Sequence, residues 1–270
     1  MQGRCSNNAD IQRNPTTKIL LILKISIITV VYNNKETVAD AIASVLNQTY
    51  DQIEYIIIDG DSTDGTIDVI NSMKENIDII ISEKDAGIYD AMNKGVLASS
   101  GDVIGILNSD DLYQDARVIE AVMNQFIQNP TLDIVYGDLV YVKSDNVAKV
   151  VRNWKSLPYH NNFFEKGNVP PHPTLFVKKR IYEEAGLFNL DFKLAADYEF
   201  MLRIFKKHNF RSRYRNKVIV KMRLGGASNK SFSNIIMQNK EILKAWKYNE
   251  LKVPLLLMPF RIIKRLIQFI

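Results

Sequence analysis

The sequence predicts an α/β fold in which a Rossmann-like, doubly wound, mostly parallel sheet is flanked by helices and followed by a C-terminal helical extension. Three observations predict this class. Short β-branched runs alternate with segments of helical periodicity over the first half of the chain. These runs are apolar throughout, as in strands that are covered on both faces. Polar clusters directly follow three of the runs, at the strand ends where such sheets bind ligands.

The first strand is expected at 25–31, a continuous β-branched run. Asn33, with Glu36 three residues later, is typical of a helix start, and apolar side chains then recur at helical spacing over 38–46. A second buried strand at 53–58 ends in the loop 59–65, which is dense in Asp, Gly, Ser and Thr. The alternation continues with helices over 66–74, 87–97 and 115–128 and strands over 77–81 and 103–107.

The second half of the chain shows a less regular pattern. Strands are expected over 134–142, 149–154, 174–178 and 210–222, with a long loop over 157–173. Helices are expected over 179–185 and 197–207 and, near the end, over 231–249 and 255–270. We therefore divide the chain into an N-terminal extension (1–23), one α/β unit (24–228) and C-terminal helices (229–270).

The composition is that of a globular protein. With 46% hydrophobic and 24% charged residues, the 270-residue chain is not disordered, collagen-like or a coiled coil. Its one cysteine, Cys5, excludes an internal disulfide and a cysteine-based metal site and fits a reducing compartment. The apolar run 19–31 is interrupted by Lys24 and is shorter than the roughly 20 residues of a membrane span. Neither a transmembrane helix nor a signal peptide is expected.

Charge is distributed unevenly along the chain. The formal net charge is +5, but residues 203–270 hold 17 Lys and Arg against two acids, Glu241 and Glu250, so the remainder is acidic. An acidic body suits a divalent metal, and a basic tail suits phosphate, nucleic acid or an anionic membrane.

The last expected helix is amphipathic and basic. Its apolar face is formed by Ile262, Ile263, Leu266, Ile267 and Ile270. Its polar face is formed by Arg261, Lys264, Arg265 and Gln268. This pattern favours a helix that lies in a membrane interface. The alternative is a helix docked on the body or on a partner subunit.

Two strand ends carry carboxylates. Asp110 and Asp111, in the run Asn108-Ser109-Asp110-Asp111, offer hard oxygen ligands for Mg²⁺ or Mn²⁺ shared with a diphosphate, or else form a polar turn before a helix. Asp59 ends the second strand, where its carboxylate can accept a hydrogen bond from a base or a ribose, or can cap the next helix.

Further polar groups lie outside these strand ends. Asp85 precedes an expected helix on which Asp90, Asn93 and Lys94 share one face. This face could point at a ligand, or it could simply be exposed to solvent. Asp197 lies at the start of an expected helix, where its carboxylate could act as a general base. On the residues alone, a helix cap is the simpler interpretation.

Two loops could bind an anion. His172 lies between two prolines. It could contact the phosphate or the acceptor, or it could have a structural role. The loop from Arg223 to Ser228 combines an arginine with two glycines, as in anion sites. No P-loop, no G-x-G-x-x-G after the first strand and no nucleophile elbow is present.

The motifs together resemble family 2 glycosyltransferases, the inverting group with the GT-A fold. The runs that carry the likeness are 28–33 (ITVVYN), 44–50 (SVLNQTY) and 57–66 (IIDGDSTDGT), and it extends from about Lys24 to Ser228. Segments 85–95 and 108–111 resemble members that build bacterial capsular, colanic-acid-like or O-antigen chains. The resemblance implies a nucleotide-binding half (24–130) and an acceptor half (131–228).

The resemblance also implies roles for individual residues. Thr29, Tyr32 and Asp59 would line the base pocket, and the donor site would further include Asp85, Asn93, Lys94 and Asn108. The family's Asp-x-Asp metal motif falls on Asn108-Ser109-Asp110, so Asp110, with Asp111, would hold the metal. The catalytic base would be Asp197, although Ala196 stands where the family has Glu. His172 and Arg223 would contact the diphosphate.

The implied function is transfer of a sugar from a nucleotide-diphospho-sugar, with Mg²⁺ or Mn²⁺, to a glycan or polyprenyl-diphosphate-linked acceptor at the inner face of the cytoplasmic membrane. UDP is the expected carrier, with GDP and dTDP as alternatives. One rival is a sugar-nucleotide nucleotidyltransferase, which needs a glycine-rich loop where this chain has Tyr32-Asn33-Asn34-Lys35. The other is a non-catalytic binding module. The acidic body argues against nucleic acid as a partner.

Overall fold

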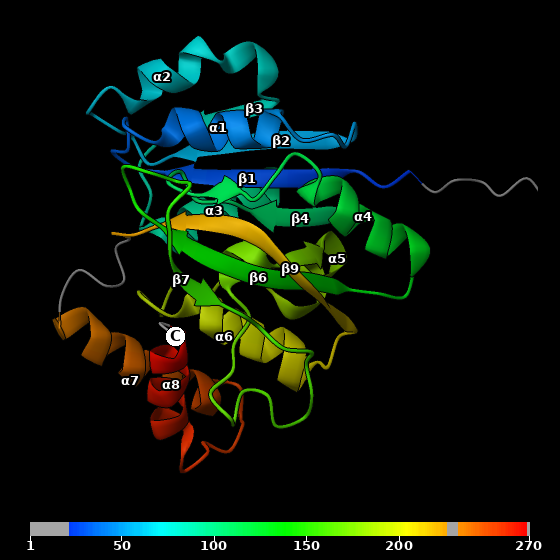
Figure 1. Cartoon of the computed structure of the whole chain (residues 1–270), viewed down its shortest axis with the longest axis vertical. Helices are drawn as coiled ribbons and strands as arrows, with labels where there is room; N and C mark the ends of the chain where they lie inside the picture. Colours follow the sequence, from blue (N-terminus) through cyan, green and yellow to red (C-terminus); the bar gives the residue numbers. More distant parts are fainter. Residues whose placement is uncertain (1–21, 226–231, 269–270) are drawn as a thin grey trace, which may run out of the picture.

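A mixed β-sheet forms the centre of the protein and carries helices on both faces (Figure 1). The computed structural model describes residues 22–225 and 232–268, and over these the sheet has nine strands. Strand order is β3-β2-β1-β4-β8-β6-β9-β5, with β7 paired to β6. The predicted α/β class with C-terminal helices is confirmed. The predictions for residues 1–21, for Gly226 to Ser228 and for Ile270 lie outside the described residues.

The first four long strands are parallel, as predicted. They are β1 (Ile25–Val31), β2 (Ile53–Asp59), β3 (Ile79–Ser82) and β4 (Val103–Ile106). The helices that connect them or follow them are α1 (Val38–Leu46), α2 (Thr66–Ser72), the short η1 (Lys74–Asn76), α3 (Ile88–Ala98) and α4 (Val118–Gln128). Val31 pairs with Asp59 and Asp59 pairs with Ser82, so these strands end at one edge of the sheet.

The second half of the sheet is mixed rather than parallel. Its strands are β5 (Leu112–Tyr113), β6 (Ile134–Val142), β7 (Val150–Trp154), β8 (Phe176–Lys178) and β9 (Ser212–Arg223). Strand β8 is antiparallel to both β4 and β6, whereas β9 is parallel to β6. A short turn joins β6 to β7, and short turns force antiparallel pairing because a parallel crossover needs a dozen or more residues. The two-residue strand β5 is too short for periodicity to reveal.

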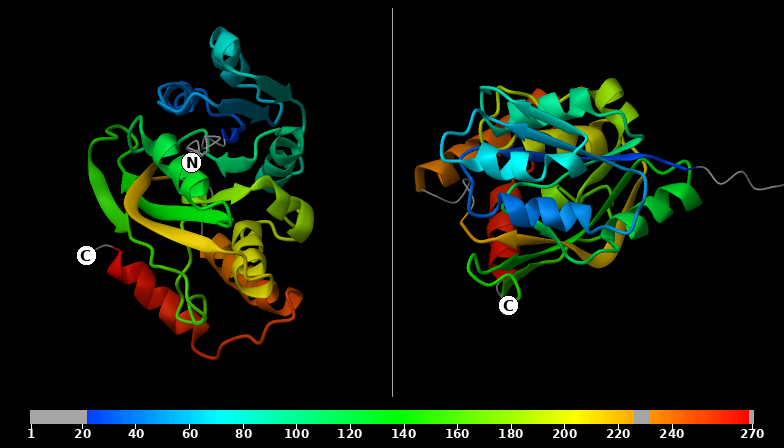
Figure 2. Two further views of the ribbon diagram at one scale, coloured as in Figure 1. Left: turned by 90° about the vertical axis from the view of Figure 1, so that its right-hand side faces the viewer. Right: turned by 90° about the horizontal axis from the view of Figure 1, so that it is seen from above.

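The remaining helices follow in the second half of the chain, and α6, α7 and α8 lie in the lower half of the view in Figure 1 (see also Figure 2). They are η2 (His172–Thr174), α5 (Lys179–Ala185), α6 (Ala196–Leu202), its π-helical continuation η3 (Arg203–Lys207), α7 (Phe232–Tyr248) and α8 (Leu257–Ile267). The predicted helix over 197–207 is thus an α-helix that widens into a π-turn.

Two apolar layers form the core, one on each face of the sheet. Ile25 and Ile27 of β1 point to the layer that contains α1 and α4, whereas Ile28 and Val30 point to the layer that contains α3, α5 and α6. Every residue of β1 is buried, which explains why this strand reads as an unbroken apolar run. The buried layers hold the strand ends, and therefore the loops that follow them, in fixed positions.

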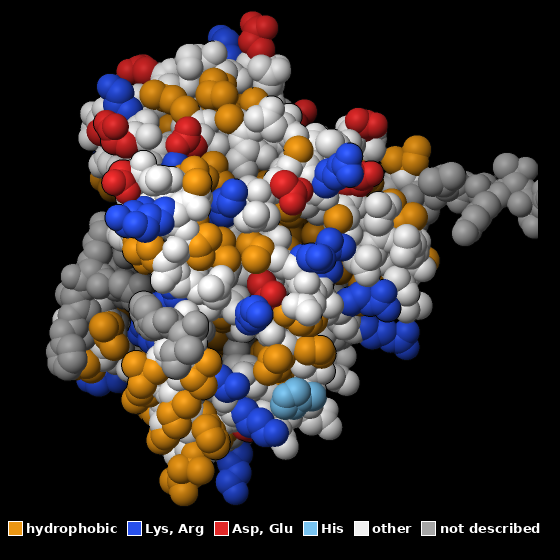
Figure 3. Space-filling view, viewed as in Figure 1, with side chains coloured by type: hydrophobic (Ala, Val, Ile, Leu, Met, Phe, Trp, Pro, Cys, Tyr) orange, Lys and Arg blue, Asp and Glu red, His pale blue; other side chains and the backbone are white. Residues whose placement is uncertain are grey.

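Helix α8 docks on the body with its polar side inward. The Arg261 guanidinium lies 5.0 Å from the ring centre of Tyr198, and Arg152 donates a hydrogen bond to Gln268. The opposite side carries exposed apolar residues, with Ile262 61% and Leu266 62% accessible. Figure 3 shows this apolar surface over α7 and α8, with Lys and Arg side chains beside it. Within residues 22–225 and 232–268, no helix has the length and apolarity needed to cross a bilayer.

Candidate active site at the carboxyl edge of the sheet

The loops that follow β1, β2 and β4 are joined by side-chain hydrogen bonds. The Asn34 amide donates to Ser109 Oγ at 2.8 Å, and Thr37 Oγ1 donates to the Ser109 carbonyl at 3.0 Å. The Asn33 backbone N–H donates to Ser62 Oγ at 2.8 Å. Three predicted polar clusters, distant in sequence, therefore form one surface at the carboxyl edge of the sheet.

Asp59 is fully buried at the end of β2 with one oxygen left unpartnered. Its Oδ2 accepts hydrogen bonds from Ser82 Oγ at 2.7 Å and from the Ser62 N–H at 3.1 Å. Its Oδ1 is buried and has no hydrogen-bond donor in the structure. Because a buried acceptor without a donor is costly, this oxygen suits a ligand N–H or O–H.

Tyr32 and Asp85 approach one another over Gly60. A Cβ atom built on Gly60 would stand 2.5 Å from Asp85 Oδ2 and 3.3 Å from Tyr32 Cδ2, so a larger residue at this position would have to displace Asp85. The Tyr32 ring is 64% exposed and free to stack on a planar ligand. Asp85 is held by a 2.8 Å hydrogen bond from the Gly87 N–H to its Oδ1. These two side chains make up a polar and aromatic surface at the end of β2, next to the buried Asp59.

Three residues predicted to contact the donor have other partners. Thr29 is fully buried and its hydroxyl accepts a hydrogen bond from Tyr55, so it lies in the interior rather than at the edge. Both groups of the Asn93 amide bond the backbone of Phe188, at 2.9 Å each, and tie α3 to a distant loop. Lys94 pairs with Glu83 at 2.8 Å; this hydrogen bond raises the pKa of Lys94. Helical spacing along α3 does not reveal such partners for Asn93 and Lys94.

The turn from Asn108 to Asp111 holds two unpartnered buried oxygens. The Asn108 Nδ2 donates to Asp111 Oδ2 at 3.0 Å, which leaves Asn108 Oδ1 and Asp111 Oδ1 without donors. Burial, and then the charge of Asp110, raise the pKa of Asp111 well above its usual range. Asp110 itself is half-buried. Buried acceptors beside a second carboxylate form a donor set that fits a hard divalent cation.

No complete metal cage accompanies this turn. Over 22–225 and 232–268, no three His, Cys, Asp or Glu side chains converge as a metal-binding group. Arg223, at the end of β9, closes the other side of the turn by donating to the Asp110 carbonyl at 3.0 Å and pairing with Asp40 at 2.5 Å. Arg223 is therefore held beside the two carboxylates by partners of its own.

Asp197 presents a half-buried carboxylate at the start of α6. The Tyr89 hydroxyl, from α3, donates to Asp197 Oδ1 at 3.0 Å. Burial, and then the negative charge of Asp197, raise the pKa of Tyr89 well above its ordinary value, so this hydroxyl stays protonated as a donor. Tyr89 was not among the predicted site residues, although it lies within the 85–95 segment.

His172 and Tyr89 share an aromatic neighbour near this carboxylate. The His172 ring stacks edge-on against Phe188 at 5.6 Å, and Tyr89 lies 6.0 Å from the same ring. Burial lowers the pKa of His172, while the charge of Asp197 opposes this effect. Phe188 thus contacts both His172 and Tyr89, the residue that donates to Asp197.

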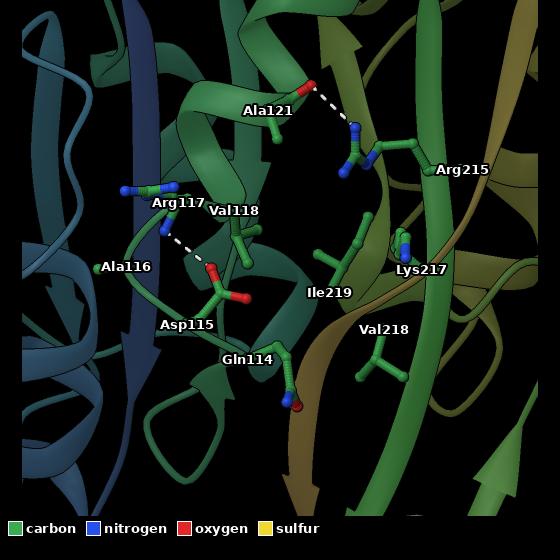
Figure 4. Close-up of a pocket in the computed structure, with 10 residues that line it drawn as sticks. All are labelled: Gln114, Asp115, Ala116, Arg117, Val118, Ala121, Arg215, Lys217, Val218 and Ile219. Atoms are coloured by element: carbon green, nitrogen blue, oxygen red, sulfur yellow. Dashed lines mark hydrogen bonds between the residues drawn. The ribbon is translucent and has the colours of Figure 1, made fainter.

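A surface hollow of about 570 Å³ lies elsewhere, between α4 and the first part of β9 (Figure 4). It is lined by Asp115, Arg117, Arg215 and Lys217, among others, and none of the predicted site residues contributes to it. The candidate site is thus defined by the polar groups at the strand ends and not by this hollow.

Comparison with known proteins identifies related sequences. Residues 26–182 match the family model described as Glycosyl transferase family 2. A PGL/p-HBAD biosynthesis glycosyltransferase of Mycobacterium bovis is 30% identical over 205 residues, which cover 74% of this chain and 75% of that protein. An uncharacterized glycosyltransferase of Haemophilus influenzae is 27% identical over 189 residues, 65% of this chain and 58% of that protein.

Solved structures share the fold at low sequence identity. S. aureus TarS 1–349 in complex with UDP-GlcNAc has a TM-score of 0.63 at 14% identity, over 90% of this chain and 79% of that one. The mannosyltransferase PcManGT of Pyrobaculum calidifontis, in complex with GDP-Man and Mn²⁺, has a TM-score of 0.60 at 17% identity, over 90% and 74%. The chain spans only 41% of another, longer TarS structure.

Proposed function

Because the chain belongs to glycosyl transferase family 2 and is a glycosyltransferase, we propose that it moves a sugar from a nucleotide-diphospho-sugar to a hydroxyl of a glycan acceptor with inversion at the anomeric carbon. The half-buried carboxylate of Asp197, held by Tyr89, is the observation that carries this proposal. A lone oriented carboxylate suits a general base. We assign donor binding to 24–130 and acceptor binding to 131–228.

The donor nucleotide would bind at the end of β2. The unpartnered Asp59 Oδ1 would accept a hydrogen bond from the base or ribose, and the exposed Tyr32 ring would stack on the base. Asp85 lies against the same glycine as Tyr32 and would contact the nucleotide or the sugar. We propose UDP as the carrier, as in the UDP-GlcNAc complex of TarS, with GDP and dTDP as alternatives.

A divalent cation, Mg²⁺ or Mn²⁺, would be held by Asp110 and Asp111, with Asn108 Oδ1 beside them. The two unpartnered buried oxygens support this assignment, and a cation would offset the burial and the Asp110 charge that raise the pKa of Asp111. Diphosphate oxygens and water would complete the coordination, since the turn alone offers few ligands. When bound, the cation neutralises charge on the diphosphate and makes it a better leaving group. Arg223 and His172 would contact the diphosphate or close over it.

The transfer itself is a single displacement. The acceptor oxygen attacks the sugar C1 from the face opposite the diphosphate, and the C1–O bond to the diphosphate breaks. Asp197 takes the proton of the acceptor hydroxyl, and the nucleoside diphosphate leaves with the bonding electrons. Because the Tyr89 hydroxyl already donates to Asp197 Oδ1, we assign the transferred proton to Oδ2.

The test begins with thermal shifts of the purified chain against UDP-, GDP- and dTDP-sugars, with and without Mn²⁺. The best donor is then assayed for nucleoside diphosphate release that depends on a polyprenyl-diphosphate-linked acceptor. Asp197→Asn should keep the donor thermal shift and lose roughly 10²- to 10⁴-fold in transfer rate. Normal transfer by this variant would refute the assignment of the base.

We further propose that α8 places the enzyme on an anionic membrane, at the inner face of the cytoplasmic membrane where a lipid-linked acceptor for surface polysaccharide would be available. Apart from the basic Arg265, the large exposed side chains of α8 are apolar, and Lys252, a few residues before the helix, is also basic and exposed. Vesicle flotation tests this contact. The double variant Ile262→Asp/Leu266→Asp should lose binding to phosphatidylglycerol vesicles by at least about tenfold. Leu97→Asp, at an equally exposed site on α3, is the control.

A further inference from the structure

The segment that leads into α6 is held by a carboxylate from another helix. Glu241 of α7 accepts hydrogen bonds from three successive backbone N–H groups, those of Lys193, Leu194 and Ala195, at 2.8, 2.8 and 2.9 Å. Asp197 follows two residues after the last of these donors. Hydrogen bonds to a charged acceptor are about twice as strong as neutral ones, so this contact fixes the local backbone.

Helix α6 has no cap of its own. Its N-cap residue is Ala195, and no side chain hydrogen bonds there from within the turn. The next residue, Ala196, also has no side chain that could accept a hydrogen bond. Glu241, 46 residues beyond Ala195 in the chain, supplies the acceptor that the local sequence lacks.

Other side chains of α7 bond the same segment. Gln238 donates to the Leu194 carbonyl at 3.3 Å, and Trp246 Nε1 donates to the Tyr198 hydroxyl at 2.9 Å. Asn249, which directly follows the end of α7, donates to the buried carboxylate of Glu199 at 2.9 Å. Helix α7 and the residue after it therefore hold the backbone before Asp197 and two side chains after it.

We infer that Glu241 is a positioning residue for the general base. It acts by fixing the backbone that presents Asp197. This inference rests on the proposed function, because it takes Asp197 as the base. It extends the working part of the enzyme to α7, beyond the 24–228 unit expected from the sequence. Displacing a catalytic group by about 1 Å can cost on the order of 10²-fold in rate.

The kinetic test compares Glu241→Gln with Glu250→Gln. The glutamine retains the shape of Glu241 but loses its charge and replaces one acceptor oxygen with a donor. We expect kcat for transfer to fall roughly 10- to 100-fold in Glu241→Gln, with KM for the donor within about twofold of wild type. Glu250, the other acid of the basic C-terminal segment, is exposed, and Glu250→Gln should match wild type. Unchanged kcat in Glu241→Gln would overturn the inference.

A second measurement does not depend on turnover. Hydrogen exchange at the amides of 193–195 should accelerate in Glu241→Gln and stay unchanged in Glu250→Gln. Wild-type exchange in Glu241→Gln would refute the inference even if the acceptor remained unidentified. Accelerated exchange in a chain whose wild type transfers no sugar would instead refute the proposed function. A lowered Tm with unchanged kcat per folded molecule would show a purely structural role.

Discussion

Replacing Gly60 by alanine is a specific test of the donor site. The added Cβ would stand 2.5 Å from Asp85 Oδ2 and 3.3 Å from both Asp85 Cγ and Tyr32 Cδ2. Ordinary van der Waals contact begins near 3.4 Å, so the carboxylate must retreat by roughly 1 Å. Gly60 does not adopt a positive φ, so alanine introduces no backbone strain.

The clash falls on the mobile end of a side chain, and this sets the expected size of each effect. Asp85 can rotate away at the cost of the hydrogen bond from Gly87, a loss of about 1 kcal/mol in the free energy of unfolding. If Asp85 contacts the donor, its displacement removes a charged hydrogen bond of roughly 1.5–3 kcal/mol, about a 10- to 100-fold rise in donor Kd. Asp197 is not displaced, so kcat at saturating donor should stay near wild type.

Calorimetric titration of the donor with Mn²⁺ gives Kd for Gly60→Ala, Asp85→Ala and the double variant. If alanine acts by moving Asp85, adding Gly60→Ala to Asp85→Ala should weaken binding little further, because coupled sites are not additive. Wild-type affinity in Gly60→Ala would refute the reasoning, as would fully additive losses in the double variant.

Three further perturbations test other contacts. Tyr89→Phe removes the hydrogen bond to Asp197 and should lower kcat about tenfold with an unchanged donor Kd. A donor affinity that falls as much as kcat would contradict this role. Burial alone would raise the pKa of Glu54, but hydrogen bonds from a lysine and two serines outweigh it and lower the pKa to about 2 from 4.5. The stability from Glu54 is therefore present above pH 4.5 and lost toward pH 2, so urea unfolding should show a loss of roughly 2–3 kcal/mol that Glu54→Gln abolishes. Gly95→Ala drives a Cβ into the buried Ile28 side chain, which has no room to move, and should cost about 1–2 kcal/mol in the same assay.

The first half of the fold was predictable because its signals are local. Each parallel strand is an apolar run that ends in a polar loop, and the register brings those loops to one edge. The mixed second half was not predictable in its pairing, since β8 lies between β4 and β6 through contacts that no local pattern encodes.

The site residues divide in the same way. Asp59 and Asp110 follow buried strands, so position alone indicated them. The structural contact of Asn93 could not be predicted because its partner, Phe188, lies 95 residues away, and Tyr89 was missed because its hydrogen bond to Asp197 spans 108 residues. One signal for Glu241 was available in the sequence, where it is one of two acids among 17 basic residues in 203–270.

The buried acids separate structural groups from those that await a ligand. Glu54 and Glu199 are almost inaccessible, and donors reach both oxygens of each: Lys24, Ser26 and Ser100 for Glu54, Arg203 and Asn249 for Glu199. Asp59 and Asp111 are equally buried, yet each keeps one oxygen without a donor. An unpartnered buried acceptor costs about 1–3 kcal/mol. Glu165, a half-buried acid paired with Lys206, also has one oxygen without a donor, but the two fully buried carboxylates that bear this cost both lie at strand ends on the carboxyl edge. A cation at Asp111 and a nucleotide N–H or O–H at Asp59 would each remove the cost, so binding is favoured where folding left the polar groups unsatisfied.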